Sequence, residues 1–284
     1  MNRTLFTAAG CARCNITKKF LKERGISYDE HDAVGAGKEL FGQFYRTHRT
    51  AMFRGKAGVE FPVLVRGAEI RQGVAVVLAW VSAGQRLDGF IGRSELSQGW
   101  VGGLHVSGGD PAAANELVTV LGFLKKHGLK LQLDTDGRNA SVLETLLDKE
   151  IGDRLVMDLK GPKALYPLLL GAEIDPAEIG RTMELAARFG EVRFETTVAP
   201  VPDPGSGSGA LRYLTADEIA ETAGWLKEAT GSHRQPYFLR WFDPQAHPDD
   251  RFQAVEKLPP NALLRHRTAA RRHQVLTEIA TITA

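Results

Sequence analysis

Apolar and polar positions along the first 84 residues switch repeatedly between the two-residue period of a strand and the 3.6-residue period of a helix. After Gly10, a helix is predicted because Ile16, Phe20 and Leu21 recur on one face. The same pattern predicts two further helices, over residues 38–47 and 74–83, and four strands, over residues 3–7, 27–31, 60–65 and 69–72. The order is strand, helix, strand, helix, strand, strand, helix, which indicates a small α/β fold.

From Gly103 onward, apolar strands alternate with amphipathic helices, a pattern typical of a parallel α/β arrangement. Five strands and four intervening helices are predicted, forming an open, barrel-like crescent. The strands are carried by "LHVSGGDP", "LKLQLDTDG", "RLVMDLKGP", "VRFETTVAP" and "QPYFLRWFDP". The Pro/Gly/Ser-rich stretch over residues 200–213 is predicted to be a long loop, and the Arg-rich tail from about residue 263 a solvated helix.

Polar residues gather where these strands end, and this edge of a parallel sheet is where ligands bind. The same residue types are also preferred in turns and as helix caps, so a binding role and a structural role both remain open. His105 alternates with Val106 and is expected in the core. The strand-end residues are Ser107, Asp110, Asp134, Asp136, Asp158, Lys160, Glu195 and Thr196.

Composition narrows the class of protein. The 284 residues are 43% hydrophobic and 25% charged, as in globular proteins large enough for two domains. A net charge of +2 does not indicate nucleic-acid binding. The longest apolar stretch, residues 74–81, is far shorter than the roughly 20 residues that cross a bilayer, and no signal peptide is recognisable. With two cysteines at CxxC spacing, we expect a cytoplasmic protein with a redox motif.

The two cysteines lie at the start of the first predicted helix. Unpaired backbone N–H groups and the positive end of the helix dipole favour an anion there, so the thiolate of Cys11 is expected to be stabilised. Cys14 lies one turn further on, close enough to form a disulfide with Cys11. Arg13, between them, is expected to add a positive charge near the thiolate.

This N-terminal segment resembles the glutaredoxin family, and within it the hydrogen-donor redoxins that reduce ribonucleotide reductases and carry a similar "CxxCxxTK" run. The resemblance covers residues 1–84 and implies a thioredoxin-like domain. It implies that Cys11 is the attacking nucleophile, Cys14 the resolving thiol and Pro62, in "VEFPVLV", the cis-proline that shapes the substrate groove. Glutathione is the ligand of many members, but "QGVAVV" replaces the start of the last helix, where the family carries an acidic residue for it.

Two other uses of the cysteines remain open. A CxxC pair can be half of a zinc site, which here requires His31 or His48 to complete it, and their spacing does not favour this. Some glutaredoxins instead share an iron–sulfur cluster between two copies, which in this chain would be held through Cys11.

Residues 101–243 resemble a second family, the radical S-adenosylmethionine activases that install the glycyl radical in anaerobic ribonucleotide reductase or pyruvate formate-lyase. The resemblance rests on "VSGGDP", "LKKHGLKLQLDTDG", "RLVMDLKGP" and "VRFETTVAP". It implies an incomplete radical-SAM-like (β/α) barrel over residues 85–284. It also implies a set of residues that hold S-adenosylmethionine, namely Ser107, Gly108, Gly109, Asp110, Asp134, Asp158 and Lys160.

The defining feature of that second family is absent from this chain. Its CxxxCxxC loop supplies three thiolates to a four-iron cluster, and no such motif occurs here. Gly84 and Pro111 are only 27 positions apart, too few for the missing first βα unit. No [4Fe–4S] cluster and no metal are therefore expected, and radical cleavage of S-adenosylmethionine is not expected.

Together these observations predict a thiol-disulfide oxidoreductase that needs no cofactor for dithiol exchange. The second domain would direct it to a disulfide-bearing protein, with a ribonucleotide reductase or a glycyl-radical enzyme as the expected partner. Two alternatives remain. One is an adaptor that binds S-adenosylmethionine or a nucleotide and senses redox state, and the other is an iron–sulfur carrier.

Overall fold

The computed structural model describes residues 3–55, 58–93, 99–203, 210–259 and 261–280. The chain forms two compact units. The first comprises Met1–Leu133 with Asp148–Gly152, and the second Asp134–Leu147 with Asp153–Ala284. The sequence analysis placed a domain boundary at residue 84 on the basis of the two family resemblances, and this boundary stays a prediction. No helix among the described residues combines the length and the apolar character needed to span a membrane.

The first unit contains a four-stranded mixed sheet in the order β2-β1-β5-β6. Strands β1 and β2 are parallel, whereas β5 runs antiparallel to both β1 and β6. The predicted mixture of strands and helices is thus confirmed at the level of an α/β fold. The strands are β1 (Thr4–Thr7), β2 (Asp29–Asp32), β5 (Val63–Arg66) and β6 (Glu69–Gln72).

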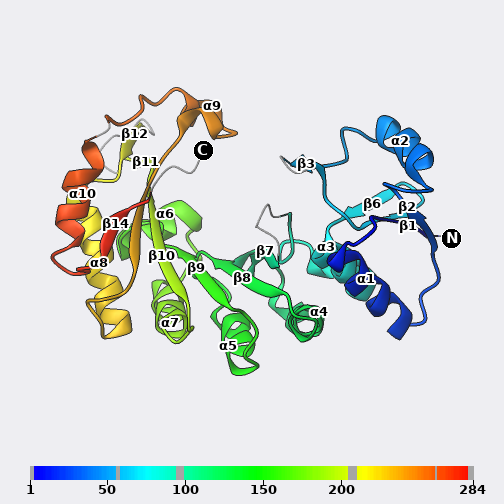
Figure 1. The fold of residues 1–284 in the computed structure, drawn as a ribbon. Helices are drawn as coiled ribbons and strands as arrows, with labels where there is room; N and C mark the ends of the chain where they lie inside the picture. Colours follow the sequence, from blue (N-terminus) through cyan, green and yellow to red (C-terminus); the bar gives the residue numbers. More distant parts are fainter. Residues whose placement is uncertain (1–2, 56–57, 94–98, 204–209, 260, 281–284) are drawn as a thin grey trace. The chain divides into compact units, whose positions relative to one another are not determined.

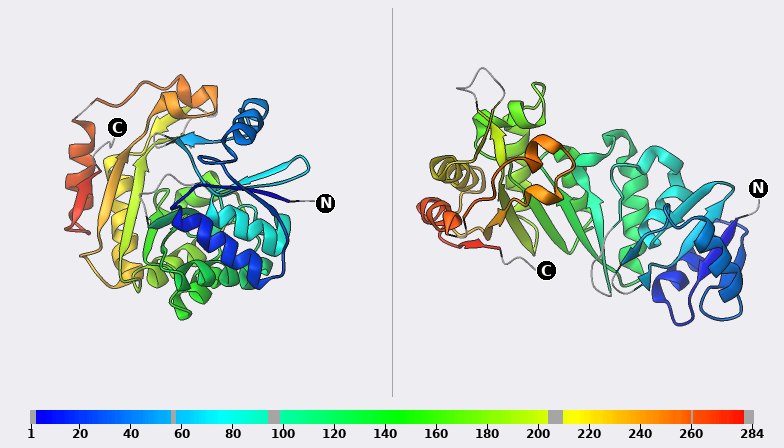
Figure 2. Two further views of the ribbon diagram at one scale, coloured as in Figure 1. Left: turned by 45° about the vertical axis from the view of Figure 1, so that its right-hand side comes forward. Right: turned by 90° about the horizontal axis from the view of Figure 1, so that it is seen from above.

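Helices cover both faces of this sheet (Figures 1 and 2). Helices α1 (Ala12–Glu23) and α3 (Val74–Ala83) lie together on one face, and α2 (Lys38–Thr47) lies on the other. Alternation along β1 explains why both faces are buried. Leu5 packs in one cluster with Leu21, Leu64, Val77 and Trp80, and Phe6 packs on the opposite face with Ala33, Met52 and Val63.

The first unit continues beyond α3. A 3₁₀ turn over Gly84–Leu87 follows, then β7 (Trp100–His105), short 3₁₀ turns over Val106–Gly108 and Pro111–Ala113, and α4 (Ala114–Lys126). Helix α3 is apolar on nearly every side because it packs against the sheet and also against α4. Phe20 of α1 meets Phe123 of α4 edge to face, with ring centroids 4.8 Å apart.

A six-stranded parallel sheet has the order β14-β13-β10-β9-β8-β7. It confirms the parallel α/β arrangement expected from residue 103 onward, while its closure into part of a barrel stays a prediction. Its remaining strands are β8 (Lys130–Thr135), β9 (Arg154–Asp158), β10 (Val192–Val198), β13 (Tyr237–Trp241) and β14 (Thr277–Ile279).

The two faces of β9, β10 and β13 differ in character. Met157, Phe194 and Leu239 are fully buried on one face, where α7 packs against β9 and α10 against β13. The other face carries the charged residues Arg193 and Glu195. The helices here are α5 (Ala140–Asp148), α6 (Tyr166–Leu170), α7 (Pro176–Ala186), α8 (Ala216–Thr230), α9 (Asp250–Gln253) and α10 (Ala262–Ala270), with 3₁₀ turns over Lys163–Leu165 and Pro244–Ala246.

Three sequence-based expectations about local structure were wrong. The predicted loop over 200–213 contains a hairpin of β11 (Pro200–Pro202) and β12 (Leu211–Tyr213), while its residues 204–209 lie outside the described residues. The predicted tail helix ends with α10, and the chain then forms β14 beside β13. His105 is exposed at the end of β7 rather than buried in the core.

Candidate active site

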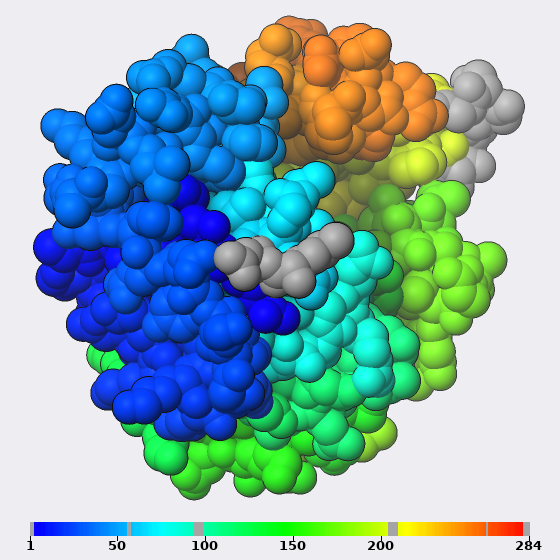
Figure 3. Space-filling model, turned by 90° about the vertical axis from the view of Figure 1, so that its right-hand side faces the viewer, coloured from blue at the N-terminus to red at the C-terminus, as the bar shows by residue number. Residues whose placement is uncertain are grey.

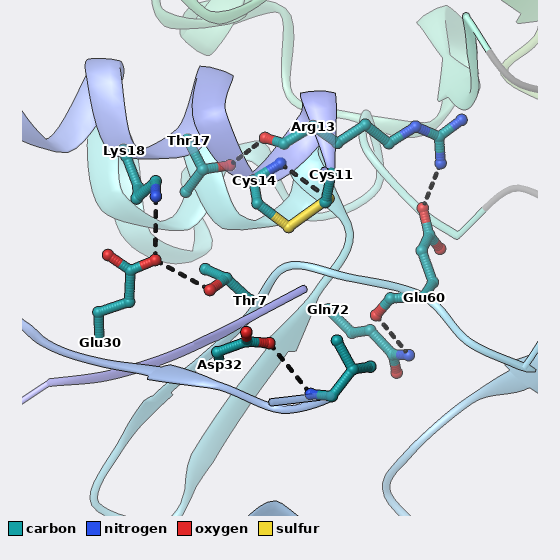
Figure 4. The surroundings of a disulfide bond; sticks show 11 residues. Thr7, Cys11, Arg13, Cys14, Thr17, Lys18, Glu30, Asp32, Glu60 and Gln72 are labelled. Carbon is teal, nitrogen blue, oxygen red and sulfur yellow. Dashed lines mark hydrogen bonds and ion pairs between the residues drawn. A yellow bond between two sulfur atoms is a disulfide. The ribbon is translucent and has the colours of Figure 1, made fainter. Parts of the chain in front are cut away.

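The two cysteines meet where β1 leads into α1. Gly10 has a φ of +73°, a left-handed conformation that glycine adopts readily, and it turns the chain between the two elements. Cys11 is then the N-cap residue of α1, and Cys14 lies in the helix's first turn. Their Cα atoms are 5.3 Å apart and their sulfur atoms form a disulfide (Figure 4). The structure therefore brings together both residues that the sequence singled out.

The two sulfur atoms differ in accessibility. Cys11 is half-buried, whereas Cys14 is only 2% exposed and belongs to the core. The backbone N–H of Cys14 donates a hydrogen bond to the Cys11 Sγ, with the two atoms 3.1 Å apart. A hydrogen bond from a helix N-terminus favours negative charge on the acceptor, so this contact is suited to a Cys11 thiolate once the disulfide is reduced.

The side chain of Arg13 points away from the disulfide rather than toward it (Figure 4). One guanidinium nitrogen lies 2.9 Å from the Glu60 carboxylate, and the other donates to the Trp100 carbonyl at 2.7 Å. The charge that Arg13 was expected to add near the thiolate is therefore paired with the Glu60 carboxylate. Glu60 lies 47 positions away in the chain, so no local pattern indicates this pair.

The segment before Pro62 is held in place by polar contacts. The buried amide of Gln72 donates to the backbone carbonyls of Phe53, at 2.8 Å, and Glu60, at 3.1 Å, and accepts from the Phe53 N–H. Because these backbone groups are partly buried, losing the Gln72 amide would remove a hydrogen-bond partner from each of them at a cost in stability. Gln72 thus fixes both ends of the segment that approaches Pro62.

Pro62 follows a cis peptide bond and precedes β5. Its carbonyl accepts a hydrogen bond of 2.9 Å from the Gly73 N–H, at the start of α3. Val63 pairs with Phe6 in the antiparallel ladder, so Pro62 lies at the end of the sheet from which β1 runs toward Cys11. That Pro62 shapes a substrate groove stays a prediction.

A second polar contact ties α1 to the sheet beneath it. The Glu30 carboxylate on β2 accepts a hydrogen bond from the buried Thr7 hydroxyl, at 2.9 Å, and pairs with the Lys18 ammonium at 3.0 Å (Figure 4). Sequence reasoning missed this network because its members lie on three different elements. It fixes the first turns of α1 against the strand that precedes the cysteines.

Glu60 provides a test by pH. Burial raises the pKa of Glu60 above its usual value of 4.5, and Arg13 and Arg93 lower it only in part. A raised carboxyl pKa means that the folded state binds the proton more tightly, so the associated stability is complete below pH 4.5 and is lost as the pH rises through the folded pKa. We expect the free energy of unfolding of the parent, minus that of Glu60→Gln, to fall over this range in urea titrations.

Glu69 is the matched control because its shift has the opposite sign. A hydrogen bond from Arg66 lowers the pKa of Glu69 below 4.5. The parent minus Glu69→Gln difference should therefore be constant above pH 4.5 and decline as the pH falls below it. Parallel curves for the two variants would contradict the assignment for Glu60.

The predicted ligand residues after β7 lie in the first unit. Asp110 is exposed, and its carboxylate accepts a 2.9 Å hydrogen bond from the Ala112 N–H, which caps the 3₁₀ turn that follows. A Cβ on Gly109 would collide with the Phe90 ring, and one on Gly108 with the Gly89 carbonyl. Close packing thus accounts for both glycines. Ser107 is half-buried, and a cofactor-binding role for this turn stays a prediction.

The other three predicted ligand residues belong to the second unit. The Lys160 ammonium pairs with the Asp158 carboxylate, so these two candidates neutralise each other, and Asp134 is half-buried at the end of β8. Sequence reasoning missed two buried phenols nearby. Burial raises the pKa of both Tyr166 and Tyr237, which stay protonated; Tyr166 accepts from the Lys160 N–H at 3.1 Å, and Tyr237 donates to Thr196 at 2.8 Å.

The residues present do not fit a [4Fe–4S] cluster. The chain's only two cysteines are joined to each other, and three thiolates are required. Among the residues that the structure describes, no three His, Cys, Asp or Glu side chains converge in a way that could hold a metal ion.

The chain was also compared with known proteins. No protein-family model matches the chain, and no curated protein matches it. Among solved structures, the glutaredoxin-like NrdH-redoxin from Escherichia coli is 22% identical, with a TM-score of 0.21 over 26% of this chain and 84% of that chain. A domain of the pyruvate-formate lyase-activating enzyme from Bacteroides vulgatus is 14% identical, with a TM-score of 0.43 over 64% of this chain and 100% of that chain.

A third solved structure, the endoglucanase Cel5A from Pseudomonas stutzeri, is 17% identical with a TM-score of 0.18 over 50% of this chain and 60% of that chain. The first two proteins are of the kinds that the sequence resembles. All three TM-scores are below 0.5, so the likenesses carry no argument about activity.

Proposed function

We propose that the protein is a thiol-disulfide oxidoreductase that uses Cys11 and Cys14 as a reversible dithiol. The observation that carries this proposal is the disulfide at the start of α1, in which the half-exposed Cys11 precedes the buried Cys14. In a pair of this kind, the Cys11 sulfur is accessible to a substrate disulfide, and the buried Cys14 sulfur is close enough to attack the mixed disulfide that forms. The metal-free sulfur chemistry needs no cofactor.

The exchange proceeds in two steps. The Cys11 thiolate attacks one sulfur of the substrate disulfide, forming a mixed disulfide and releasing the other substrate sulfur as a thiolate. The Cys14 thiolate then attacks the Cys11 Sγ, which closes the 11–14 disulfide and releases the second substrate thiolate. Two electrons pass from the dithiol to the substrate, the two released thiolates take up the two protons, and an external thiol or dithiol reductant restores Cys11 and Cys14.

The fold fits this role. We assign the N-terminal part to the thioredoxin-like, glutaredoxin type, and its four-stranded mixed sheet with helices on both faces supports this assignment. We assign the six-stranded sheet to an incomplete radical-SAM-like barrel without its cluster loop. A dithiol that must be re-reduced after each turnover is suited to the reducing cytosol.

The partner we propose is a disulfide-bearing protein of nucleotide reduction, either a ribonucleotide reductase or a glycyl-radical enzyme, because the two parts of the sequence separately resemble accessories of these systems. The second part would select this target. In this second part, Asp158 and Lys160 form an ion pair, which neutralises two of the groups that would otherwise attract S-adenosylmethionine. We therefore assign the second part a role in docking the partner and no role in catalysis.

The Cys14→Ser variant tests the proposal. With the resolving sulfur removed, the mixed disulfide between Cys11 and the substrate should accumulate, because the second step has no nucleophile. We expect a covalent adduct of about one substrate per protein with a disulfide peptide, detected by intact mass and released by dithiothreitol. The Cys11→Ser/Cys14→Ser double variant is the control and should form none. Equal adduct formation by both variants would contradict the proposal.

A further inference from the structure

Three arginines surround one hollow at the end of α2. Arg46 lies in the last turn of α2, Arg49 in the loop that follows, and Arg54 in β3 (Arg54–Gly55), and all three are exposed. Together with Tyr45 and Met52 they line a hollow of about 670 Å³. The surface of α2 and of this loop, in the brighter blue, is turned to the viewer in Figure 3. We call these three arginines the arginine triad.

The triad has no acidic partner among the residues that the structure describes. Elsewhere in the same unit, Arg13 pairs with Glu60 and Arg66 with Glu69. The position of Arg46 in the last turn of α2 can be explained without a ligand, because a positive charge there complements the negative end of the helix dipole. Arg49 and Arg54 lie outside the helix, so the dipole does not explain their positions. Guanidinium groups stay charged at every accessible pH, so three of them around one hollow attract anions and repel one another until an anion binds.

The floor of the hollow is apolar. Met52 is only 6% exposed and packs in the cluster that contains Phe6 and Val63, and Tyr45 packs against the same cluster. A single inorganic anion would fill a small part of this volume and leave the floor uncovered. Several carboxylate side chains on a peptide, whose methylene groups can cover Met52 and Tyr45, match both the charge and the apolar floor.

One residue of the hollow, Arg54, pairs with the segment that leads to Pro62. Arg54 pairs with Val59 across the β3–β4 hairpin, whose second strand is β4 (Gly58–Val59), three residues before Pro62. Phe61 packs on Phe41 of α2, with ring centroids 5.2 Å apart. A chain that lies along Pro62 and continues past Val59 would therefore reach Arg54 and the rest of the triad.

From these observations we propose that the arginine triad binds an acidic segment next to the reactive disulfide of the partner protein. This inference rests on the proposed function, because it names the chemistry of the substrate on which Cys11 acts. The partner would carry several aspartate or glutamate residues flanking its disulfide. Charge complementarity would raise the rate of productive encounter more than the rate of sulfur exchange.

The test uses two synthetic peptides that share one disulfide, one flanked by Asp and Glu and the other by Ser and Gln. At low salt, we expect the reduced parent protein to show a kcat/KM about tenfold higher for the acidic peptide, as several charge pairs each contribute a modest factor. The preference should shrink as sodium chloride is raised. Arg46→Gln/Arg49→Gln/Arg54→Gln should lose it while reducing the neutral peptide at the parent rate.

The matched control removes three charges elsewhere in the same unit. Lys19 and Lys22 on α1 and Lys126 on α4 are exposed, and Lys19→Gln/Lys22→Gln/Lys126→Gln should keep the preference. No preference in the parent would overturn the proposal. So would a preference that survives in the arginine variant, or one lost equally in the lysine control.

A binding measurement separates this inference from the proposed chemistry. An acidic peptide with both cysteines replaced by serine carries no disulfide, so its fluorescence anisotropy with the oxidised protein reports docking alone. Binding that is about tenfold weaker in the arginine variant supports the triad even if no peptide is reduced, in which case the oxidoreductase proposal fails. Displacement of the peptide by inorganic phosphate, but not by chloride at equal ionic strength, would identify a phosphate site and overturn the acidic-segment proposal.

Discussion

Cys11→Ser is expected to abolish disulfide reduction, bringing the rate down to that of the buffer and reductant alone. Cys11 is the N-cap of α1, and its sulfur accepts the Cys14 N–H. A serine hydroxyl can keep this hydrogen bond, so the fold should be preserved. It is not ionised at neutral pH, however, and an oxygen nucleophile does not exchange with a disulfide. The measurement is the release of thiol from a disulfide peptide under excess reductant.

Two further variants make the result specific. Ala12→Ser, at the exposed position after Cys11, should retain the parent activity, because it changes neither sulfur. When it is pre-reduced and assayed without external reductant, Cys14→Ser should release at most one thiol per protein, since Cys11 can attack the substrate but no second sulfur can resolve the mixed disulfide. If Cys11→Ser retained a large fraction of the activity while Cys14→Ser lost all of it, the roles of the two cysteines would be reversed.

Phe20→Ala is expected to destabilise the first unit by about 3–5 kcal/mol, the range for removing a buried aromatic ring. Phe20 is fully buried in α1, with its ring edge to face with that of Phe123 at 4.8 Å. The cavity would lie between α1 and α4, where the backbone on both sides is helical and cannot easily collapse. Hydrogen exchange followed by mass spectrometry can measure the loss at the amides of α1 and β5 separately from those of the second unit.

Lys19→Ala, next to Phe20 but exposed, is the control and should change the stability by less than about 0.5 kcal/mol. Phe123→Ala should also destabilise the unit. The double variant should fall short of the sum of the single effects by about 1 kcal/mol, because the ring pair can be lost only once. Full additivity would show that the two rings do not stabilise each other.

Much of the first unit could be predicted because its signals are local. The helices over 38–47 and 74–83 and the strand over 69–72 have the predicted bounds. The strand predicted over 60–65 instead covers Val63–Arg66, because Pro62 has no N–H to donate to the ladder. Strand β14 was missed because three residues, Thr277–Ile279, carry no period of their own and are fixed by pairing with β13.

At the site, the sequence located the cysteine pair but not its surroundings. The position of Cys11 at the start of a helix follows from Gly10 and the apolar spacing after it. The partner of Arg13 does not, because Glu60 is brought to it only by the folded sheet. The arginine triad was missed for a different reason: its members lie in one short stretch, residues 46–54, but the strand and helix pattern does not show that the turn after α2 places them around one hollow.

The packing of α4 over α1 and α3 bears on how this chain can be dissected. A fragment ending near Gly84 would keep the cysteine pair and the four-stranded sheet, yet it would expose to water the side of α3 that α4 covers and one face of the Phe20 ring. Such a fragment would be prone to self-association. We therefore expect a cut at the predicted boundary near residue 84 to yield a fragment that associates with itself, and a cut after α4 to avoid this exposure.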